Sequence, residues 1–412
     1  MNVHSDAAAA EADALVDVRV LGGAAEAVEA ALAFADRIRP GAAVRDAKRL
    51  RPVAEIRDLR ATGLLGMTVP RTLGGPDVPV RTLVEVFRII SAADPAIGQI
   101  PQSHFSHLDT LRLLGSDAQK AFFFRDVLRG NLWGNALSER GTKGGLANIK
   151  TRLTRVGPDQ YILEGRKYYT TGALFSQWIP VTAFDEESKT VMALVRRHAK
   201  GVEIVDDWNS MGQRGTASGT VMFTNVAVPE EFVVPFWRFT EAPSTRFAFG
   251  QIMHIAIDIG IAEEALDDAV AYVRTRSRPW PAANLAAAGD DPHVIQRVGE
   301  LKVQIEAAKA LLYRAADEFD AVQAAPYREA AVVDLALLVA AAKAAASAAA
   351  VRVSSDMFAL AGTSAADETW NLHRHWRNAR THTLHDPEAW KYHYIGDFVL
   401  NGRKPPRGAL IL

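Results

Sequence analysis

The stretch MGQRGTASGTVMFTNVAVP (residues 211–229) joins a loop of glycines and small hydroxyl residues to a segment with the composition of a β-strand. Its second part, TVMFTNVAV (220–228), is rich in β-branched residues, which fit a pleated, half-buried surface. Similar short segments precede it, at TRLTRV (151–156), YILEGRKYY (161–169), WIPVTAF (178–184) and TVMALVR (190–196). Because turn-forming residues separate several of them, we predict a small antiparallel β domain or barrel.

Helical periodicity dominates on both sides of this β domain. Before it, apolar residues recur every three or four positions along 24–38, 53–64 and 82–90. After it, longer patterns of the same kind cover 252–273, 294–319 and 328–360. The last of these contains AAAKAAASAAA (340–350), which we predict to be a closely packed helix, because alanine is the best helix former.

The order of these segments predicts an α+β protein of several domains. We expect a flexible tail over residues 1–20, an N-terminal helical domain over 21–134, the central β domain over 135–240 and a C-terminal bundle of long helices over 241–412. The loop TVPRTLGGPDVP (68–79) interrupts the first helical domain, because proline and glycine break helices.

Composition excludes several classes of function. The chain has 412 residues with 47 Lys plus Arg against 48 Asp plus Glu, so it carries no basic surface for nucleic acid or anionic membranes. It has no cysteine, which excludes disulfides, thiolate-held metals, iron–sulfur clusters and a thiol nucleophile. We find no signal peptide and expect no membrane-spanning stretch. A cytoplasmic protein is therefore expected.

The common cofactor loops are missing as well. No G-x-G-x-x-G follows a strand, and the chain has no Walker A loop, no H-E-x-x-H and no G-x-S-x-G elbow. A nicotinamide-binding Rossmann unit is therefore not expected, and any cofactor must be held in another way.

Polar and aromatic residues gather beside glycine in GQIPQSHFSHLDTL (98–111), WGNALSERGTKGG (133–145), GRKYYTTGALFSQW (165–178) and DDWNSMGQRGTASGT (206–220). Each segment taken singly can be an ordinary loop between elements. Together, their hydroxyl groups and exposed backbone suit hydrogen bonds to the edge of a heteroaromatic ring or to a phosphate.

A histidine-rich stretch, HRHWRNARTHTLHDPEAWKYHYIGDFVLNG (373–402), is the most informative. Asp386 and Pro387 predict a helix start, with the aspartate as N-cap and the proline as first helical residue. His385 then lies just before this helix and His382 in the turn that leads to it. The histidines can also serve only to cap and pack, or bind a metal, but without a spaced carboxylate motif we predict no metal site.

The segments 211–229 and TVPRTLGG (68–75) resemble the acyl-CoA dehydrogenase superfamily. Five further segments resemble the reduced-flavin monooxygenase branch of this superfamily: IGQIPQSHF (97–105), WGNALSERGTK, TTGALF (170–175), VRTRSRPW (273–280) and RNARTHTLHDP (377–387). Dibenzothiophene monooxygenase and the sulfur-acquisition oxidoreductases of sulfone metabolism belong to this branch. The resemblance covers nearly the whole chain from about residue 20. It implies the superfamily fold: an N-terminal helical domain, a central β-barrel domain and a C-terminal long-helix bundle.

The resemblance also implies the site residues. Its catalytic positions fall on His104, Asn135, Thr171, His382 and His385. Its flavin-binding positions fall on Ser138, Thr170, Trp208, Ser218, Arg274, Arg278 and Ser364, with the arginines expected to reach phosphate across a subunit boundary. In this scheme Asn135, Thr171 and His385 contact the reactive flavin edge, and His104 and His382 frame the substrate.

The implied function is that of a two-component monooxygenase. Reduced FMN arrives from a separate NADH:flavin reductase, O2 adds to give a C4a-hydroperoxide, and a small organosulfur substrate is oxygenated. FMN is favoured over FAD because the adenine-side motifs survive only as RSRPW (276–280) and ALAGTS (359–364). The branch further implies a homotetramer.

Two other functions are compatible with the sequence. One is an FAD-dependent acyl-CoA dehydrogenase in which Asp386 acts as the base, and the other is a helical scaffold without activity. The substrate stays open among sulfide, sulfoxide, sulfone, thiophene and amine.

Overall fold

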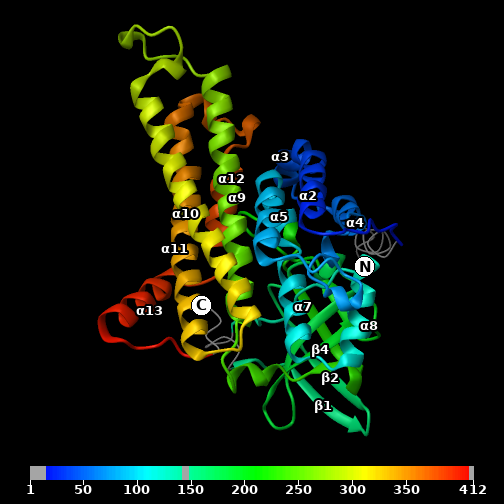
Figure 1. Cartoon of the computed structure of the whole chain (residues 1–412). Helices are drawn as coiled ribbons and strands as arrows, with labels where there is room; N and C mark the ends of the chain where they lie inside the picture. Colours follow the sequence, from blue (N-terminus) through cyan, green and yellow to red (C-terminus); the bar gives the residue numbers. More distant parts are fainter. Residues whose placement is uncertain (1–14, 142–147, 408–412) are drawn as a thin grey trace.

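The computed structural model describes residues 15–141 and 148–407 of the chain. It consists of a helical part at the N-terminus, a β-sheet in the middle and a bundle of long helices at the C-terminus, as the sequence predicts (Figure 1). Residues 1–14 of the predicted tail and residues 142–145 of the segment 133–145 lie outside the described residues.

The N-terminal helices are α2 (Ala24–Ile38), α3 (Ala42–Lys48), α4 (Val53–Ala61), α5 (Val80–Ala93), α6 (Pro95–Gln99), α7 (Gln102–Leu114) and α8 (Asp117–Leu128). The expected helices at 24–38, 53–64 and 82–90 correspond to α2, α4 and α5. Helix α7 was not predicted, because its buried residues include Ser103, His104, His107 and Asp109 and so interrupt the apolar pattern of a helix face.

The strands are β1 (Arg152–Gly157), β2 (Gln160–Lys167), β3 (Trp178–Phe184), β4 (Thr190–Arg196), β5 (Val202–Val205), β6 (Thr220–Pro229) and β7 (Val233–Val234). They form one sheet in the order β5-β6-β2-β1-β3-β4-β7. Neighbours are antiparallel, as predicted, except that β1 and β3 are parallel. In the β2–β6 pair Lys167 lies opposite Val221, so residues leaving β2 meet residues entering β6.

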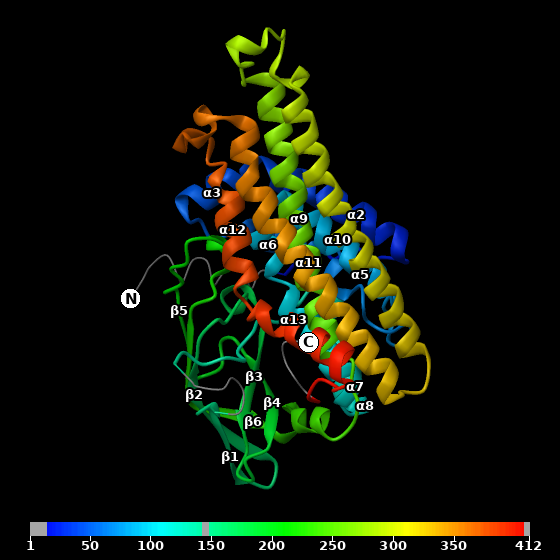
Figure 2. The same cartoon turned by 90° about the vertical axis from the view of Figure 1, so that its left-hand side faces the viewer.

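The C-terminal helices are α9 (Arg246–Thr275), α10 (Pro292–Ala324), α11 (Glu329–Ala361), α12 (His373–Thr383) and α13 (Glu388–Asn401). Figures 1 and 2 show α9, α10 and α11 side by side, whereas α13 turns out from the bundle. Helix α9 also packs against α5 and α7, and one continuous apolar core therefore joins the bundle to the N-terminal helices.

The predicted start of the last helix was wrong in its details. Helix α13 begins at Glu388, Pro387 occupies the N-cap position, and no side chain caps the helix. The Asp386 carboxylate accepts a hydrogen bond from His385 instead. His382 lies inside the last turn of α12 and not in the turn that follows it.

The expectation that no stretch is apolar enough for a membrane also needs correction. Among the described residues, α11 is long and apolar enough to cross one, by length and composition alone. It packs against α9, α10, α12 and α13, and 44% of its most apolar window is buried within the chain. Its alanine-rich sequence therefore serves close helix packing, as the sequence analysis expected.

Candidate functional site

Three hydroxyl groups form a row where the chain leaves β2 and enters β6. The hydroxyl oxygens of Thr171 and Ser218 lie 2.7 Å apart, and those of Ser218 and Thr216 lie 2.8 Å apart. Thr170 ties the two segments together, since its Oγ1 donates to the carbonyl oxygen of Gly219 at 2.8 Å. Thr216 and Ser218 are buried and Thr171 is only partly buried, so the row opens at Thr171.

The buried end of this row sets the direction of its protons. Thr216 Oγ1 donates to the carbonyl oxygen of Gln213 at 3.0 Å. Because that proton is used, the Ser218 hydroxyl donates to Thr216 and the Thr171 hydroxyl donates to Ser218. The Thr171 oxygen is then an acceptor at the open end, so the row matches a ring nitrogen that carries a hydrogen.

Asn135 lies beside this row and is held on both sides of its amide. Its Nδ2 donates to the carbonyl oxygen of Tyr169 at 3.0 Å, and its Oδ1 accepts from Nε2 of His107 at 3.3 Å. Burial and the nearby charge of Arg246 lower the pKa of His107 to about 3, so its ring is neutral. His107 lies in the segment 98–111 but was not among the predicted site residues; its spacing of three residues from His104 on one helix was the available signal.

His104 was predicted to frame the substrate, but its buried ring is bound to the backbone instead. Its Nε2 donates to the carbonyl oxygen of Leu65 at 2.9 Å, and its Nδ1 accepts from the backbone N–H of Trp133 at 3.1 Å. Both ring nitrogens are thus taken by backbone, and burial lowers the pKa of His104 to about 4. Because it binds the backbone N–H of Trp133, the His104 ring fixes the start of the segment that carries Asn135.

A group of three aromatic rings adjoins the hydroxyl row. The rings of Tyr168 and Tyr169 lie 4.8 Å apart, and Trp208 lies about 6 Å from each, with centroid distances of 6.2 and 6.1 Å. Trp208 Nε1 donates to the carbonyl oxygen of Gln213 at 2.9 Å. Tyr169 is 52% exposed and has a backbone φ of 61°, so its ring is held outward.

A buried ion pair fixes residues 137–139 to the sheet. Lys167 Nζ lies 3.1 Å from the carbonyl oxygen of Leu137 and 3.1 Å from Glu139 Oε1. Burial lowers the pKa of Lys167 to about 8, although Glu139 opposes this change. The carbonyl oxygen of Ser138 accepts from the backbone N–H of Tyr168 at 3.0 Å, which places Ser138 beside the aromatic group.

A cluster of histidines lies at the end of α12. His382 Nδ1 lies 2.5 Å from Asp258 Oδ1, and His382 Nε2 lies 2.9 Å from His254 Nδ1. The His254 ring in turn lies against the ring of His385, with centroids 4.2 Å apart. His382 is completely buried behind His254, so it cannot frame a substrate directly as predicted.

His385 is the member of this cluster that reaches the surface, with a side chain 46% exposed. Its Nδ1 lies 3.0 Å from Asp386 Oδ1, and Lys391 Nζ lies 3.5 Å from Asp386 Oδ2. Burial by itself would raise the pKa of Asp386, but the charges of His385 and Lys391 outweigh it and hold the pKa far below its usual range.

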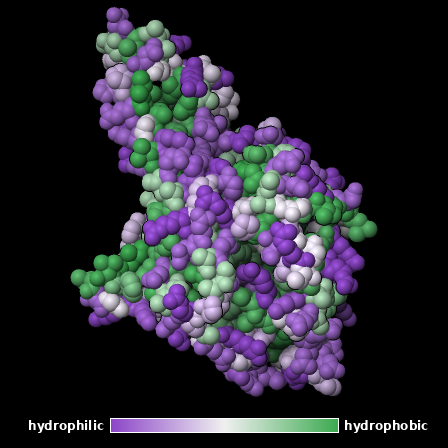
Figure 3. Space-filling view, viewed as in Figure 1, coloured by the Kyte–Doolittle hydropathy of each residue, from purple (hydrophilic) through white to green (hydrophobic). Residues whose placement is uncertain are grey.

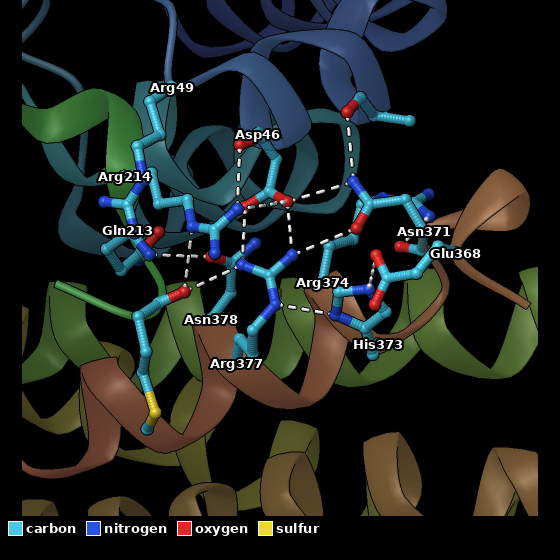
Figure 4. A network of polar contacts seen from close by, with 12 residues as sticks. Asp46, Arg49, Gln213, Arg214, Glu368, Asn371, His373, Arg374, Arg377 and Asn378 are labelled. Carbon is cyan, nitrogen blue, oxygen red and sulfur yellow. Dashed lines mark hydrogen bonds and ion pairs between the residues drawn. The ribbon is translucent and has the colours of Figure 1, made fainter. Parts of the chain in front are cut away.

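A network of charged groups joins α12 to the loop that carries the hydroxyl row (Figure 4). The backbone N–H of Gln213 donates to Asn378 Oδ1 at 2.7 Å. Arg377 donates to the carbonyl oxygen of Met211 at 2.7 Å, and it also forms an ion pair with Asp46 of α3. Gly212 permits this approach, since a Cβ there would lie 2.0 Å from the carbonyl oxygen of Arg377. Because Gln213 also holds the buried end of the row, the row and the histidine-bearing helix are fixed to one another.

The structure does not bring all predicted cofactor residues together. Arg274 and Arg278 lie at and beyond the end of α9, and Ser364 accepts a hydrogen bond from Tyr272 at 3.0 Å in the same region. Along α9, Arg274 is about 30 Å from His254 at the usual rise per residue. One flavin mononucleotide cannot reach both places within one chain.

The remaining groups fit the ring of a flavin. The site offers a partly buried hydroxyl, a fixed amide, neutral histidines and an outward-facing aromatic ring, which are the usual partners of a flat heteroaromatic ring with a polar edge. The structure describes no group of three or more carboxylate or histidine side chains placed to hold a metal ion.

Comparisons with known proteins bear on the family and the fold of the chain. Profiles of the acyl-CoA dehydrogenase N-terminal, middle and C-terminal domains match residues 25–131, 134–226 and 252–387. The chain is 36% identical over 370 residues to a dibenzothiophene monooxygenase of Mycolicibacterium goodii, which covers 85% of this chain and 88% of the relative. It is 31% identical over 354 residues to SfnC of Pseudomonas putida, a probable FMNH2-dependent monooxygenase, with coverages of 84% and 88%.

The fold matches a solved structure over nearly its whole length. FMN-bound TdsC from Paenibacillus sp. A11-2 superposes with a TM-score of 0.89 and 28% sequence identity, over 93% of this chain and 99% of that one.

Proposed function

The chain belongs to the FMNH2-dependent monooxygenase branch of the acyl-CoA dehydrogenase superfamily, and from that premise we propose that it transfers one oxygen atom of O2 to a small organosulfur compound. Reduced FMN, when bound, would supply the electrons that send the other oxygen atom to water. The relatives named for dibenzothiophene support a sulfur-containing substrate.

The contacts of the Asp386 carboxylate favour this proposal over the dehydrogenase alternative. A dehydrogenase needs a carboxylate base free to take a proton from its substrate. Asp386 is 8% exposed, holds His385 through Oδ1 and lies near Lys391 through Oδ2. A carboxylate whose pKa is lowered by two such neighbours is a weak base, so the site is better suited to hydrogen bonding than to proton abstraction.

We assign the chain's own groups to separate tasks. Thr171, at the open end of the hydroxyl row, and Asn135 would bind the polar edge of the flavin, and Tyr169 with Trp208 would cover its ring. His385 would donate or accept at the reacting oxygen, because it is the exposed ring of its cluster. Excluding water from these groups would favour oxygen transfer over release of peroxide.

We propose that a second copy of the chain completes the cofactor site and that the assembly is a homotetramer. Arg274 lies about 30 Å along α9 from His254 at the usual rise per residue, and Arg278 and Ser364 lie in the same region as Arg274. Helix α13 leaves Trp390, Val399 and Leu400 exposed, and Figure 3 shows an apolar surface over this projecting helix. Such surface on a water-exposed helix favours contact between copies.

The proposal further includes a separate NADH:flavin reductase as the source of reduced FMN, and a cytoplasmic location. The absence of a nicotinamide-binding G-x-G-x-x-G motif from the sequence supports an external reductant.

The proposed function is tested by supplying the purified chain with reduced FMN, O2 and a panel containing dibenzothiophene, a dialkyl sulfone, a dialkyl sulfide and an alkyl sulfinate. We expect an oxygenated product from at least one sulfur compound and no oxidation of NADH unless a reductase is added. Reduction of bound flavin by a saturated acyl-CoA, with no oxygenated product from the panel, would favour the dehydrogenase instead.

A further inference from the structure

Behind His385 lies a row of buried polar groups to which the proposed function gives no role. His254 and Asp258 lie one turn apart on α9, His382 comes from α12, and Lys343 comes from the middle of α11. Each of these residues is at most 3% exposed. Burying polar groups costs free energy unless each of them is hydrogen-bonded or paired, so their contacts indicate what the row does.

The Asp258 carboxylate determines which nitrogen of each ring carries a proton. An ionised carboxylate only accepts, so Nδ1 of His382, 2.5 Å from Oδ1, must carry a proton. In the neutral His382 ring, Nε2 is then an acceptor, and His254 must donate to it from Nδ1 across 2.9 Å. The hydrogen bonds therefore run in one direction, from His254 through His382 to Asp258.

Two further groups keep Asp258 ionised. Its Oδ2 pairs with Lys343 Nζ and accepts from Ser347 Oγ at 3.1 Å. Burial alone would raise the pKa of Asp258, but the charge of Lys343 and the contact with His382 lower it to about 2. Burial also lowers the pKa values of His254 and His382, and both rings are neutral at rest.

We propose that His254, His382 and Asp258 form a proton relay that ends behind His385, and that His254 and Asp258 are positioning residues acting through it. An acidic group bound in the site gives up a proton to Nε2 of His254, and the N–H bond at Nδ1 of His254 then breaks as its proton passes to Nε2 of His382. The positive charge then lies against Asp258, and the reverse movement returns the proton. Each step breaks one bond to hydrogen and forms another, so protons and charge balance.

The outer ring of the relay, His254, lies against the exposed ring of His385. These rings have centroids 4.2 Å apart and planes inclined by 34°. The other charged groups around them are Asp386, Lys391 and Lys343. The inference rests on the proposed function, because oxygen transfer with reduced FMN moves protons within a site that must exclude solvent. A buried relay can hold a proton there without admitting solvent.

A second cluster on the same pair of helices offers a matched comparison. Asp268 of α9 lies 2.8 Å from Nε2 of His375 and also pairs with Arg374. It repeats the combination of carboxylate, histidine and cation, but in the described contacts no second ring lies against His375. Asp268→Asn is therefore the control for Asp258→Asn.

The first test needs neither flavin nor substrate. Protein labelled with 15N in its histidines is studied by solid-state NMR, and His382→Gln identifies the His382 signals. We expect the Nδ1–H form of His382 in the wild type and the Nε2–H form in Asp258→Asn, because an amide can turn to donate to Nδ1. Asp268→Asn should leave these signals unchanged. An Nε2–H form in the wild type would overturn the relay.

The second test separates a relay from simple packing. His254→Asn keeps a donor for His382 Nε2 but cannot pass a proton. We expect it to bind FMN as tightly as the wild type, yet to form at least about 10-fold less product per reduced FMN, with a changed pH profile. Unchanged yield and pH profile in both His254→Asn and Asp258→Asn would contradict the relay.

Two controls complete this test. If Asp258→Asn does not fold, Asp258→Asn combined with Lys343→Met removes both charges and is tested in its place. The NMR test needs no turnover, so it tests the relay even if the proposed function is wrong. A wrong proposed function would instead be recognised because the wild type oxygenates no compound of the panel.

Discussion

The histidines considered for the site differ in whether packing leaves a ring nitrogen available to a bound molecule. Both nitrogens of His104 bind backbone, and His382 is enclosed by Asp258 and His254. His385 keeps a ring that is 46% exposed, although its Nδ1 contacts Asp386. A histidine with a free and exposed nitrogen can act on a bound molecule, whereas the enclosed ones act on the structure around them.

This difference predicts the behaviour of His385→Ala. The variant should bind FMN normally, because the hydroxyl row and Asn135 are untouched, but release hydrogen peroxide in place of product. Losing one aligned hydrogen bond in a closed site typically costs about 10²–10³ in rate. Product and peroxide are counted per reduced FMN. His375→Ala, which removes a buried ring paired with Asp268, should change stability and leave this ratio as in the wild type.

Buried neutral histidines also predict how stability depends on pH. Burial lowers the pKa values of His104 and His107 to about 4 and about 3, while an unfolded histidine titrates near 6.5. The unfolded state therefore takes up protons first, so stability is fully present above about pH 6.5 and falls as the pH drops toward 4 and below.

The measurement is the unfolding free energy between pH 4 and pH 7. His107→Gln keeps a donor for Asn135 and removes one titrating group, so the slope should fall by up to about 1.4 kcal/mol per pH unit. His293→Gln, at an exposed position, is the control. Equal slopes in His107→Gln and the wild type would show that His107 does not titrate as described.

At the scale of elements, the sequence predicted the helices and strands better than their polar contents. The glycine and hydroxyl segments pointed to Thr171 and Ser218 as candidates only because several such segments occur together, since each one alone is typical of a turn beside a strand. His254, Asp258 and Lys343 were missed, since each lies inside an apolar helix and the periodicity hides it. Their spacing was the available signal: His254 and Asp258, like Lys343 and Ser347, are four residues apart on one helix face.

The contact between the 211–219 loop and α12 is testable through Gly212. A Cβ at this position would lie 2.0 Å from the carbonyl oxygen of Arg377, so Gly212→Ala must push the loop from the helix. We expect a loss of about 1–3 kcal/mol in stability and weaker FMN binding. Gly289→Ala, which has open space around it, is the control. FMN affinity equal to that of the wild type would show that the contact between the loop and α12 does not affect FMN binding.

At the scale of the whole molecule, the two groups of residues that we propose for the cofactor lie far apart in one chain. The flavin-edge groups lie beside the sheet, and the predicted phosphate groups Arg274, Arg278 and Ser364 lie at the far end of α9. The resemblance predicted both groups and implied that the arginines act across a subunit boundary, but the distance within one chain follows only from the length and packing of α9.

This separation predicts a tetramer whose contacts include α13. Light scattering at micromolar concentration should give four times the mass of the chain. Leu400→Lys, at a position 82% exposed on α13, should lower the mass and weaken FMN binding together. Val156→Lys, on strand β1 and 58% exposed, should change neither. A monomer that binds FMN with full affinity would contradict the shared site.

The central claim is that this chain inserts oxygen from O2 into an organosulfur compound at the expense of reduced FMN. The direct measurement is a single turnover in which flavin-free protein is loaded with reduced FMN without oxygen and then mixed with 18O2 and the sulfur compound. We expect mass spectrometry to find one 18O atom in each product molecule, with product formed in proportion to reduced FMN. An unlabelled substrate with all reduced FMN recovered as hydrogen peroxide, for every sulfur compound in the panel, would contradict the claim.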